Sequence, residues 1–232
     1  FTGVPELKGR KIVKKIWKMI EQFIFPKLKY VYTVNESIAE LYRKEYGTDV
    51  KVVRNFPFLV ASRKEKNAAE QKKKIGLPED KKIILYQGSV NVDRGLQETV
   101  EAMQYVENAV LMIIGDGDII NEIKTLTKNL KLNKKIFFYK RVPFEQLHEY
   151  TLIADIGISL DKDTNINYRY SLPNRIFDYI HAGIPVLASP LVEIKKIFSE
   201  YNIGMLIENH MPKHIAEKIN FMLNDETKRK YR

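Results

Sequence analysis

The sequence of 232 residues contains no cysteine, which excludes a disulfide framework and any metal or thiol chemistry that depends on cysteine. It also contains no apolar run close to the roughly 20 residues that span a bilayer as a helix. Internal repeats and low-complexity segments are absent as well. The lack of cysteine fits a reducing compartment, and we expect the protein to be cytoplasmic.

Positive charge is in excess, because 39 Lys and Arg residues against 29 Asp and Glu residues give a net charge of +10. The excess is concentrated in residues 8–18 and 63–74. Such runs are usually solvated surface, but they also attract nucleic acid, anionic lipid or phosphorylated small molecules. The second run has no aromatic side chains on which bases could stack, which argues against a nucleic-acid partner.

Short apolar strands alternate with helices, which predicts an α/β fold around a parallel sheet covered on both faces. Six apolar segments predict its strands: residues 82–87, 109–115, 135–140, 155–160, 186–189 and 204–207. We predict that residues 56–232 form one complete, doubly wound, Rossmann-like domain. Residues 1–55 are interpreted as the end of an N-terminal domain, followed by a linker at Asn55-Phe56-Pro57. The chain begins at Phe1, and we interpret it as a fragment of a longer protein.

Polar side chains follow the ends of the predicted strands, where open parallel sheets bind their ligands. Gly88 and Arg94 follow the first strand, and Arg141 follows the third. Each of these residues alone is explained by a plain turn or a surface cation. Because the carboxyl ends of parallel strands share one edge of a sheet, we expect both arginines to face the same crevice.

The stretch SLPNRIFDYIHAGIPVLAS predicts a helix that begins at Pro173 and Asn174, with a buried strand directly after it. Proline suits the first turn because its missing N–H would have no partner there. The free N–H groups of a helix N-terminus favour an anion, and Arg175 adds a full positive charge. Asp178 lies one turn on and can accept hydrogen bonds from sugar hydroxyls. Together with the other strand ends, this helix predicts a nucleotide-diphosphate site.

Four segments, in this order and spacing, resemble a known family: IILYQGSVNVDRGL, LMIIGDGD, FFYKRVPFEQLHEYTLIADIGIS and SLPNRIFDYIHAGIPVLAS. The chain resembles the C-terminal domain of glycosyltransferase family 4, also called group 1, preceded by the end of the N-terminal domain. The resemblance implies the GT-B architecture, with an active site between two Rossmann-like domains. It also implies a hexosyltransferase of polysaccharide biosynthesis that retains the anomeric configuration. Such an enzyme moves a sugar from a nucleotide-diphosphate sugar to a glycan or lipid-linked acceptor, with no metal and no other cofactor.

The resemblance also implies a set of donor-binding residues. They are Gly88, Ser89, Arg94, Gly95, Arg141, Val142, Leu172, Pro173, Asn174, Arg175 and Asp178. Within this set Arg94 would bind the diphosphate and Asp178 would hold the ribose. The loop at Arg141 and Val142 would present its backbone to the base.

Two positions depart from the family pattern. Ser89 stands where the family commonly has an arginine, so one phosphate-binding charge is missing. Tyr170 stands where the family has the first of two acids that grip the donor, and Asp161 and Asp163 are candidates to replace that acid. In the subgroup that the chain resembles most, residues 172–174 would offer backbone amides to the donor, and an arginine replaces the usual lysine at 175.

The sequence assigns no catalytic group. His148 lies on a helix well past its loop and His181 lies near a helix C-terminus, so neither is favoured as a base. The turn at Gly117 explains Asp116 and Asp118 better than a metal site does. Two alternatives stay open: a sugar-nucleotide epimerase on the same fold, and a non-catalytic module that binds a nucleotide or a nucleic acid.

A basic amphipathic helix is predicted at residues 11–25, with apolar side chains on one face and four lysines on the other. Its apolar face either packs onto a domain outside this chain or makes a peripheral contact with the inner face of an anionic membrane.

Because transfer needs an acceptor held against the donor, we expect this fragment to bind the donor without turnover.

Overall fold

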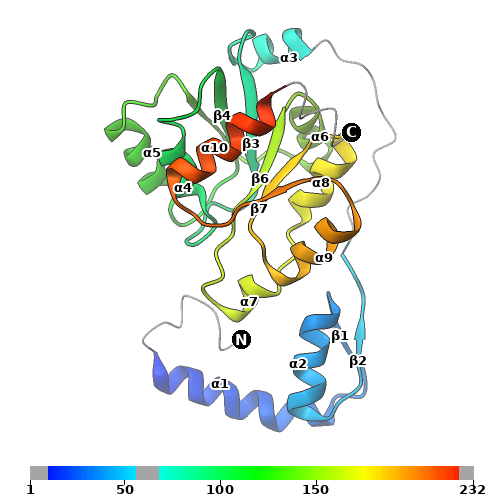
Figure 1. Cartoon of the computed structure of the whole chain (residues 1–232). Coiled ribbons are helices and arrows are strands. Elements are labelled where there is room, and N and C mark those ends of the chain that lie inside the picture. The colour runs from blue at the N-terminus through cyan, green and yellow to red at the C-terminus, as the bar shows by residue number, and fades with distance from the viewer. Residues whose placement is uncertain (1–9, 56–67, 225–232) are drawn as a thin grey trace. The chain divides into compact units, whose positions relative to one another are not determined.

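The computed structural model describes residues 10–55 and 68–224, which form two compact units. The first unit comprises residues 10–55, 163–172 and 191–193, and the second comprises residues 68–162, 173–190 and 194–224. Figure 1 labels the helices and strands of both units. In chain order they are α1 (Lys11–Ile24), η2 (Phe25–Lys27, a 3-10 helix), β1 (Val31–Thr33), α2 (Glu36–Tyr46), β2 (Val50–Val52), α3 (Ala68–Lys74), β3 (Lys82–Gln87), α4 (Leu96–Ala102), β4 (Ala109–Ile114), α5 (Ile120–Asn129), β5 (Ile136–Tyr139), α6 (Phe144–Leu152), β6 (Ile156–Ser159), α7 (Ile166–Arg169), α8 (Asn174–Ala182), β7 (Val186–Ala188), α9 (Val192–Glu200), β8 (Gly204–Leu206) and α10 (Pro212–Leu223).

A parallel sheet with the strand order β5-β4-β3-β6-β7-β8 forms the centre of the second unit. The chain builds β3, β4 and β5 toward one edge and then returns to the middle, where Ile156 of β6 pairs with Ile84 of β3. Strand order therefore reverses between β3 and β6. Open parallel sheets bind ligands at such a reversal, outside the carboxyl ends of the strands.

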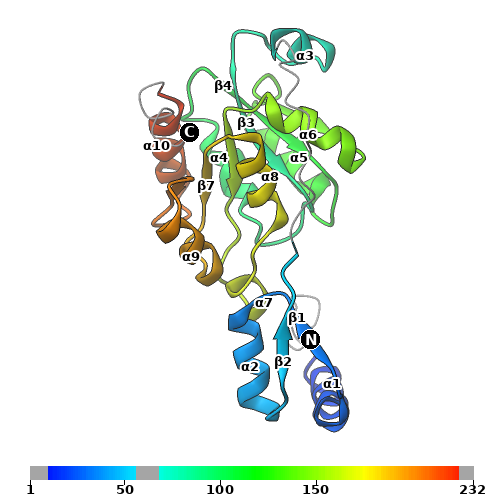
Figure 2. The same cartoon turned by 90° about the vertical axis from the view of Figure 1, so that its right-hand side faces the viewer.

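Helices cover both faces of this sheet, as expected for strands that are apolar on both sides (Figures 1 and 2). Side chains alternate between the faces along a strand. Ile84 and Tyr86 of β3 belong to the apolar cluster that also contains residues of α4, α5 and α10. Gln87 of the same strand points to the opposite face, where it contacts both α6 and α8. The end of β3 thus carries a polar side chain on the α6 and α8 face.

Helix α8 lies close against the sheet because Gly157 of β6 has no side chain. A Cβ at Gly157 would lie 2.3 Å from the ring of Tyr179 in α8. The buried Tyr179 hydroxyl lies 3.2 Å from the carbonyl oxygen of Leu85 and 3.3 Å from that of Ile158. These contacts hold α8 across β3 and β6, which brings the first turns of α8 to the strand reversal.

The first unit contains a short parallel pair, β1 and β2, in which Val31 lies opposite Val50. Helix α2 between these strands has a cap at each end: the Asn35 side chain accepts a hydrogen bond from the N–H of Ile38 (2.9 Å), and Gly47 ends the helix at φ +64°. The buried Asn35 also donates to the carbonyl oxygen of Tyr170 (2.7 Å), which joins residues 163–172 to this unit.

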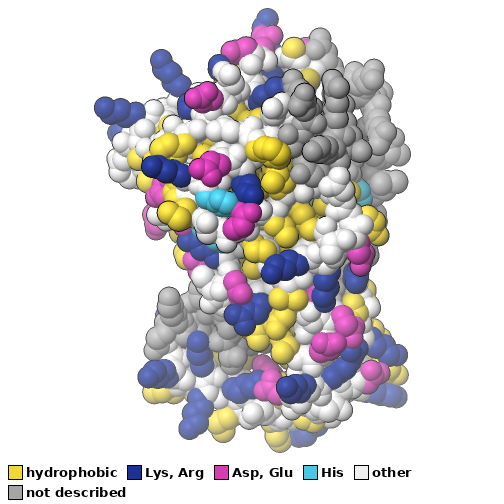
Figure 3. Space-filling view, viewed as in Figure 1, with side chains coloured by type: hydrophobic (Ala, Val, Ile, Leu, Met, Phe, Trp, Pro, Cys, Tyr) yellow, Lys and Arg dark blue, Asp and Glu magenta, His cyan; other side chains and the backbone are white. Residues whose placement is uncertain are grey.

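Helix α1 is anchored to α2 through polar side chains. Nζ of Lys18 lies 2.5 Å from Glu45 and 2.7 Å from the hydroxyl of Tyr46, and the ring of Phe25 stacks on Tyr42. The apolar face of α1 is exposed through Ile12, Ile16, Trp17, Met19, Ile20, Phe23 and Ile24. Basic and hydrophobic side chains both reach the surface along this helix in Figure 3. None of the helices in the described part of the chain is long and apolar enough to cross a membrane.

The six predicted strands, the helix predicted at residues 11–25 and the helix start at Asn174 are confirmed, with ends that differ by at most one residue. The structure adds α7 between β6 and α8, where no helix is predicted from the sequence. Asn165 caps this short helix by accepting a hydrogen bond from the N–H of Tyr168 (3.0 Å). A helix of four residues is too short to show a periodic apolar pattern. The predicted linker at Phe56-Pro57 and parts of both basic runs lie outside the described residues.

Candidate functional site

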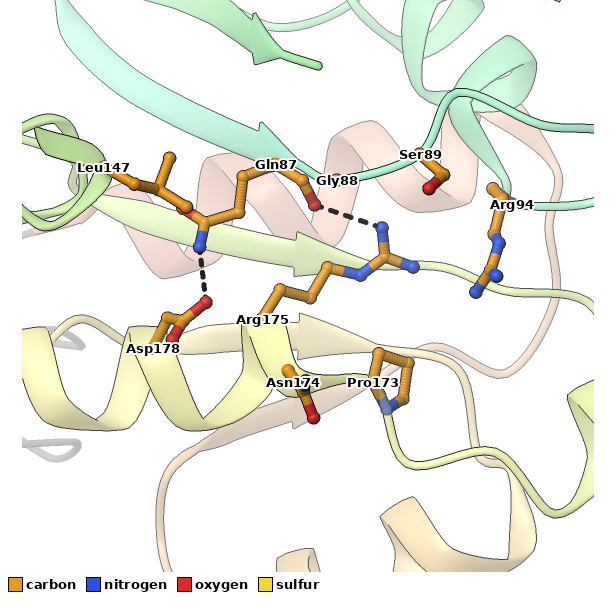
Figure 4. A pocket seen from close by; sticks show the side chains of 9 residues that line it. All are labelled: Gln87, Gly88, Ser89, Arg94, Leu147, Pro173, Asn174, Arg175 and Asp178. Atoms are coloured by element: carbon orange, nitrogen blue, oxygen red, sulfur yellow. Dashed lines mark hydrogen bonds between the residues drawn. The ribbon is translucent and has the colours of Figure 1, made fainter. Parts of the chain in front are cut away.

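A pocket of about 370 Å³ lies where the strand order reverses, within the size range of small-molecule sites. It is lined by the end of β3, the loop that follows β3, α6 and the first turns of α8. Figure 4 shows the residues that line it: Gln87, Gly88, Ser89, Arg94, Leu147, Pro173, Asn174, Arg175 and Asp178. Seven of the eleven predicted donor-binding residues are among them, so segments far apart in the sequence do converge on one pocket.

Asp161 bridges the two arginines that line this pocket. Its Oδ1 lies 2.8 Å from Nη1 of Arg94, and its Oδ2 lies 2.5 Å from Nη2 of Arg175. Burial alone would raise the pKa of Asp161, but the charges of Arg175 and Arg94 outweigh that effect and hold the pKa below its usual range. The two arginines and one carboxylate together carry one net positive charge.

The two arginines have different surroundings. Arg175 is only 7% exposed: its Nε donates to Oγ of Ser159 (3.1 Å), its Nη1 donates to the carbonyl oxygen of Gln87 (3.4 Å), and its guanidinium lies over the ring of Tyr86. The side chain of Arg94 is 24% exposed. Arg94 is therefore the arginine that presents more of its charge to the pocket, and Arg175 holds the surrounding groups together.

Asp161 does not fill the role of the missing donor-gripping acid that was considered for it. Its side chain is 0% exposed and both of its oxygens are engaged by arginines, so it presents no acceptor to a sugar. Asp163, the other candidate, lies in the first unit and pairs with Nε of Arg169 at 2.9 and 3.2 Å. The prediction for Asp163 stays a prediction.

Asp178 lines the same pocket one turn further along α8. Nε2 of Gln87 donates to its Oδ2 at 2.7 Å (Figure 4). Burial raises the pKa of Asp178, although the Gln87 hydrogen bond and the charges of His181 and His148 act against the rise. An ionised carboxylate in this position can accept hydrogen bonds from ligand hydroxyls.

A second pocket of about 200 Å³ adjoins the first. The two share Gly88, Ser89 and Leu147. The residues that line the second pocket are Gly88, Ser89, Ile114, Gly115, Asp116, Arg141, Val142 and Leu147. Arg141 and Val142 therefore lie in the hollow next to the one that holds Arg94 and Asp178, which supports the expected convergence of the strand ends.

Gly95 and Leu172 are the two predicted residues that are missing from the described linings of both pockets. Gly95 precedes α4 at φ +71°, and a Cβ there would lie 2.1 Å from the carbonyl oxygen of Leu160, so close packing requires glycine. Leu172 belongs to the first unit. Conversely, Gln87 and Leu147 line the pocket and were not predicted. Gln87 was detectable as a polar residue at the end of an apolar strand, whereas Leu147 carries no such signal.

The catalytic group stays unassigned. His148 and His181 are not among the residues that line the two pockets. Asp116 lines the second pocket, and its Oδ1 accepts a hydrogen bond from the N–H of Gly117 (2.9 Å). Within residues 10–55 and 68–224, no group of three or more His, Asp or Glu side chains is placed to hold a metal ion.

The strand reversal and the two pockets beside it define the second unit as an α/β domain of the Rossmann-like class, with a site where such domains bind ligands. Residues 67–232 match the model of the family described as glycosyl transferases group 1, and the chain belongs to this family. The group predicted from the four sequence segments is therefore confirmed.

Individual relatives agree with this assignment. The D-inositol 3-phosphate glycosyltransferase of Xylanimonas cellulosilytica is 22% identical over 246 residues, which cover 97% of this chain and 54% of that protein. The structure of sucrose-phosphate synthase from Thermosynechococcus elongatus has a TM-score of 0.76 at 19% identity and covers 98% of this chain and 57% of that chain. Anabaena HepE, solved in complex with UDP and glucose, has a TM-score of 0.73 at 13% identity, with 90% and 58% covered.

These structural likenesses confirm the predicted α/β fold of the GT-B type. The chain spans between 32% and 54% of the length of the curated relatives it matches.

Proposed function

We propose that the protein to which this chain belongs is a family 4 glycosyltransferase. It moves a sugar, as a hexosyltransferase, from a nucleotide-diphosphate sugar to a glycan or lipid-linked acceptor with retention of configuration. It uses neither a metal nor another cofactor. The second unit binds the donor, and this chain alone holds the donor without transferring its sugar, because most of the acceptor side is supplied by other residues.

The observation that carries this proposal is the convergence of charge and acceptor groups in one pocket. Arg94, the N-terminus of α8 and Asp178, one turn further along α8, line the same pocket. We assign the first two to the diphosphate and Asp178 to the ribose hydroxyls. In the transfer step the departing diphosphate gains negative charge, and fixed cations stabilise that charge. The complex of HepE with UDP and glucose supports a nucleotide-sugar donor.

Asp178→Asn is expected to weaken UDP binding about tenfold, because the carboxylate loses a charge-assisted hydrogen bond to the ribose. Binding of 2′,3′-dideoxy-UDP is expected to stay nearly unchanged, because this analogue has no ribose hydroxyls. Isothermal titration calorimetry of both ligands measures the difference. A thermal-shift panel with GDP, ADP and CDP then identifies the base, since the ligand that binds best raises the melting temperature most.

A matched control for this prediction is Asp118→Asn, which changes an exposed aspartate outside both pocket linings in the same way. Its affinity for UDP is expected to equal that of the wild type. Equal losses of UDP and dideoxy-UDP binding in Asp178→Asn would remove Asp178 from the ribose-binding role.

We further propose that α1 holds the protein at the inner, cytoplasmic face of an anionic membrane. The exposed apolar side chains lie on one face of α1, and Lys11, Lys14 and Lys15 lie on the other. Each cation near an anionic surface contributes about 1 kcal/mol before screening. We expect the protein to sediment with anionic but not neutral vesicles, and salt should reverse the binding.

Charge reversals distinguish α1 from the general positive charge of the protein. Lys11→Glu with Lys15→Glu changes two exposed lysines of α1, and Lys73→Glu with Lys74→Glu changes two exposed lysines of α3. Only the first pair is expected to abolish sedimentation. The fluorescence of Trp17, the single tryptophan, should shift to the blue on binding if α1 enters the interface. Sedimentation that both pairs reduce equally would contradict a specific role for α1.

A further inference from the structure

Gln87 occupies a position where the fold alone favours an apolar residue. It is the last residue of β3, it is 2% exposed, and four apolar or aromatic residues precede it in the same strand. A buried amide is tolerated only when its polar atoms find partners. The partners of Gln87 therefore indicate why a glutamine stands there.

The side chain of Gln87 joins helices α6 and α8 across the end of the sheet. Its Nε2 lies 2.7 Å from Oδ2 of Asp178, and its Oε1 lies 3.0 Å from Oγ1 of the buried Thr151. An ionised carboxylate only accepts hydrogen bonds, so the NH₂ group of the amide faces Asp178 and the oxygen faces Thr151. The carboxylate of Asp178 thus fixes which end of the amide points to α8, and the Thr151 hydroxyl donates to the other end.

The main chain of Gln87 contacts the same helix three residues earlier. Nη1 of Arg175 donates to the carbonyl oxygen of Gln87 at 3.4 Å (Figure 4). Arg175 and Asp178 are three residues apart and lie on one face of α8. One residue of β3 therefore holds both the phosphate end and the ribose end of the proposed donor site.

We propose that Gln87 is a positioning residue of the donor site, which orients the carboxylate of Asp178 so that it can hold the ribose. This proposal rests on the proposed function for the ribose, but the effect on Asp178 itself can be measured without any nucleotide. With Oδ2 fixed by Gln87, the carboxylate has one defined orientation toward the pocket.

The charge of Asp178 depends on groups from three elements. Burial raises its pKa, and Gln87 on β3, His181 on α8 and His148 on α6 act against the rise. The charge of Asp178 in turn helps to raise the pKa of the neighbouring Tyr179. Without the Gln87 hydrogen bond, one of the groups that lower the pKa of Asp178 is gone, while burial still raises it. The pKa of Asp178 should then rise further, and the carboxylate should become protonated at a higher pH.

The decisive variant is Gln87→Leu, which keeps the size of the side chain and removes both amide contacts. We expect a higher pKa of Asp178 by carbon-13 NMR and about tenfold weaker UDP binding. The decline of UDP binding at low pH should begin at a higher pH than in the wild type. Binding of 2′,3′-dideoxy-UDP should change little. Thr151→Val removes the contact of the hydroxyl with the Gln87 amide, together with its contact to the carbonyl oxygen of Leu147 within α6, and should shift the same quantities in the same direction by less.

The control is Gln104→Leu, the same change at an exposed glutamine outside the described pocket linings, and it should leave all these quantities unchanged. An unchanged Asp178 pKa in Gln87→Leu would overturn the proposal, and so would equal losses of UDP and dideoxy-UDP binding. The two proposals fail on different results. If the wild type bound UDP and dideoxy-UDP equally well, Asp178 would not hold the ribose and the proposed function of this site would be wrong. A raised pKa of Asp178 in Gln87→Leu would still show that Gln87 acts on Asp178.

Discussion

Asp161→Ala is expected to lower the free energy of unfolding of the second unit by about 3–5 kcal/mol, because it leaves a buried charge without its partner. Arg175 is 7% exposed and would keep its charge while losing the carboxylate that neutralises it. Arg94 would lose its ion pair as well. Urea denaturation followed by circular dichroism measures the loss.

The control for Asp161 is an aspartate–arginine pair at the surface. Asp163 pairs with Arg169, and both side chains are exposed, so Asp163→Ala should change stability little because water screens such pairs. The pKa of Asp161 is lowered in the folded state, so its contribution is present above the ordinary aspartate pKa and is lost as the pH falls through the lowered value. Equal stabilities of Asp161→Ala and the wild type near neutral pH would contradict the bridge.

Arg94→Ala is expected to weaken nucleoside-diphosphate binding by about 1.5–3 kcal/mol, the range for hydrogen bonds to charged groups. The fold should survive this change, because Asp161 keeps its contact with Arg175. Arg94→Lys keeps the charge but loses the forked donor, so its affinity for UDP should lie between those of the wild type and Arg94→Ala. Calorimetry with UDP and with uridine separates the phosphate contribution, since uridine should bind all three proteins equally.

A matched control for Arg94 is Arg43→Ala on α2, which removes another arginine from an ion pair, here with Glu36. This variant should bind UDP as the wild type does. If Arg94→Ala retained full affinity for UDP, or lost uridine binding to the same extent, the diphosphate would not lie at Arg94.

Much of the fold could be predicted from the sequence because its signals are local. Continuous apolar runs such as residues 109–114 indicate buried parallel strands, and Pro173 with Asn174 marks the start of a helix. Helix α7 was missed because four residues show no period. The partition of residues 163–172 and 191–193 into the first unit depends on contacts between distant segments, which no local pattern contains.

The sequence predicted where the candidate site lies, but not which of its side chains contact one another. Strand ends and a helix N-terminus indicate where charged residues gather, and Arg94, Arg175 and Asp178 do line one pocket. What the sequence could not provide is which charges face each other. Asp161 is a candidate in the sequence to replace the family acid missing at Tyr170, but tertiary packing places it between two arginines. The roles of Gln87 and Arg175 likewise depend on side-chain contacts between segments far apart in the chain.

The reversal of strand order between β3 and β6 also has a consequence for folding. These neighbouring strands are separated in the chain by two complete strand–helix repeats, so their pairing closes a long loop and comes late in any local pathway. The pocket exists only after this closure, since its walls come from both sides of the reversal. The proposed nucleotide affinity should therefore appear only once the native strand order is in place. During synthesis on the ribosome, we expect the nascent chain to gain the proposed affinity only after α8 has emerged, because α8 lines the pocket.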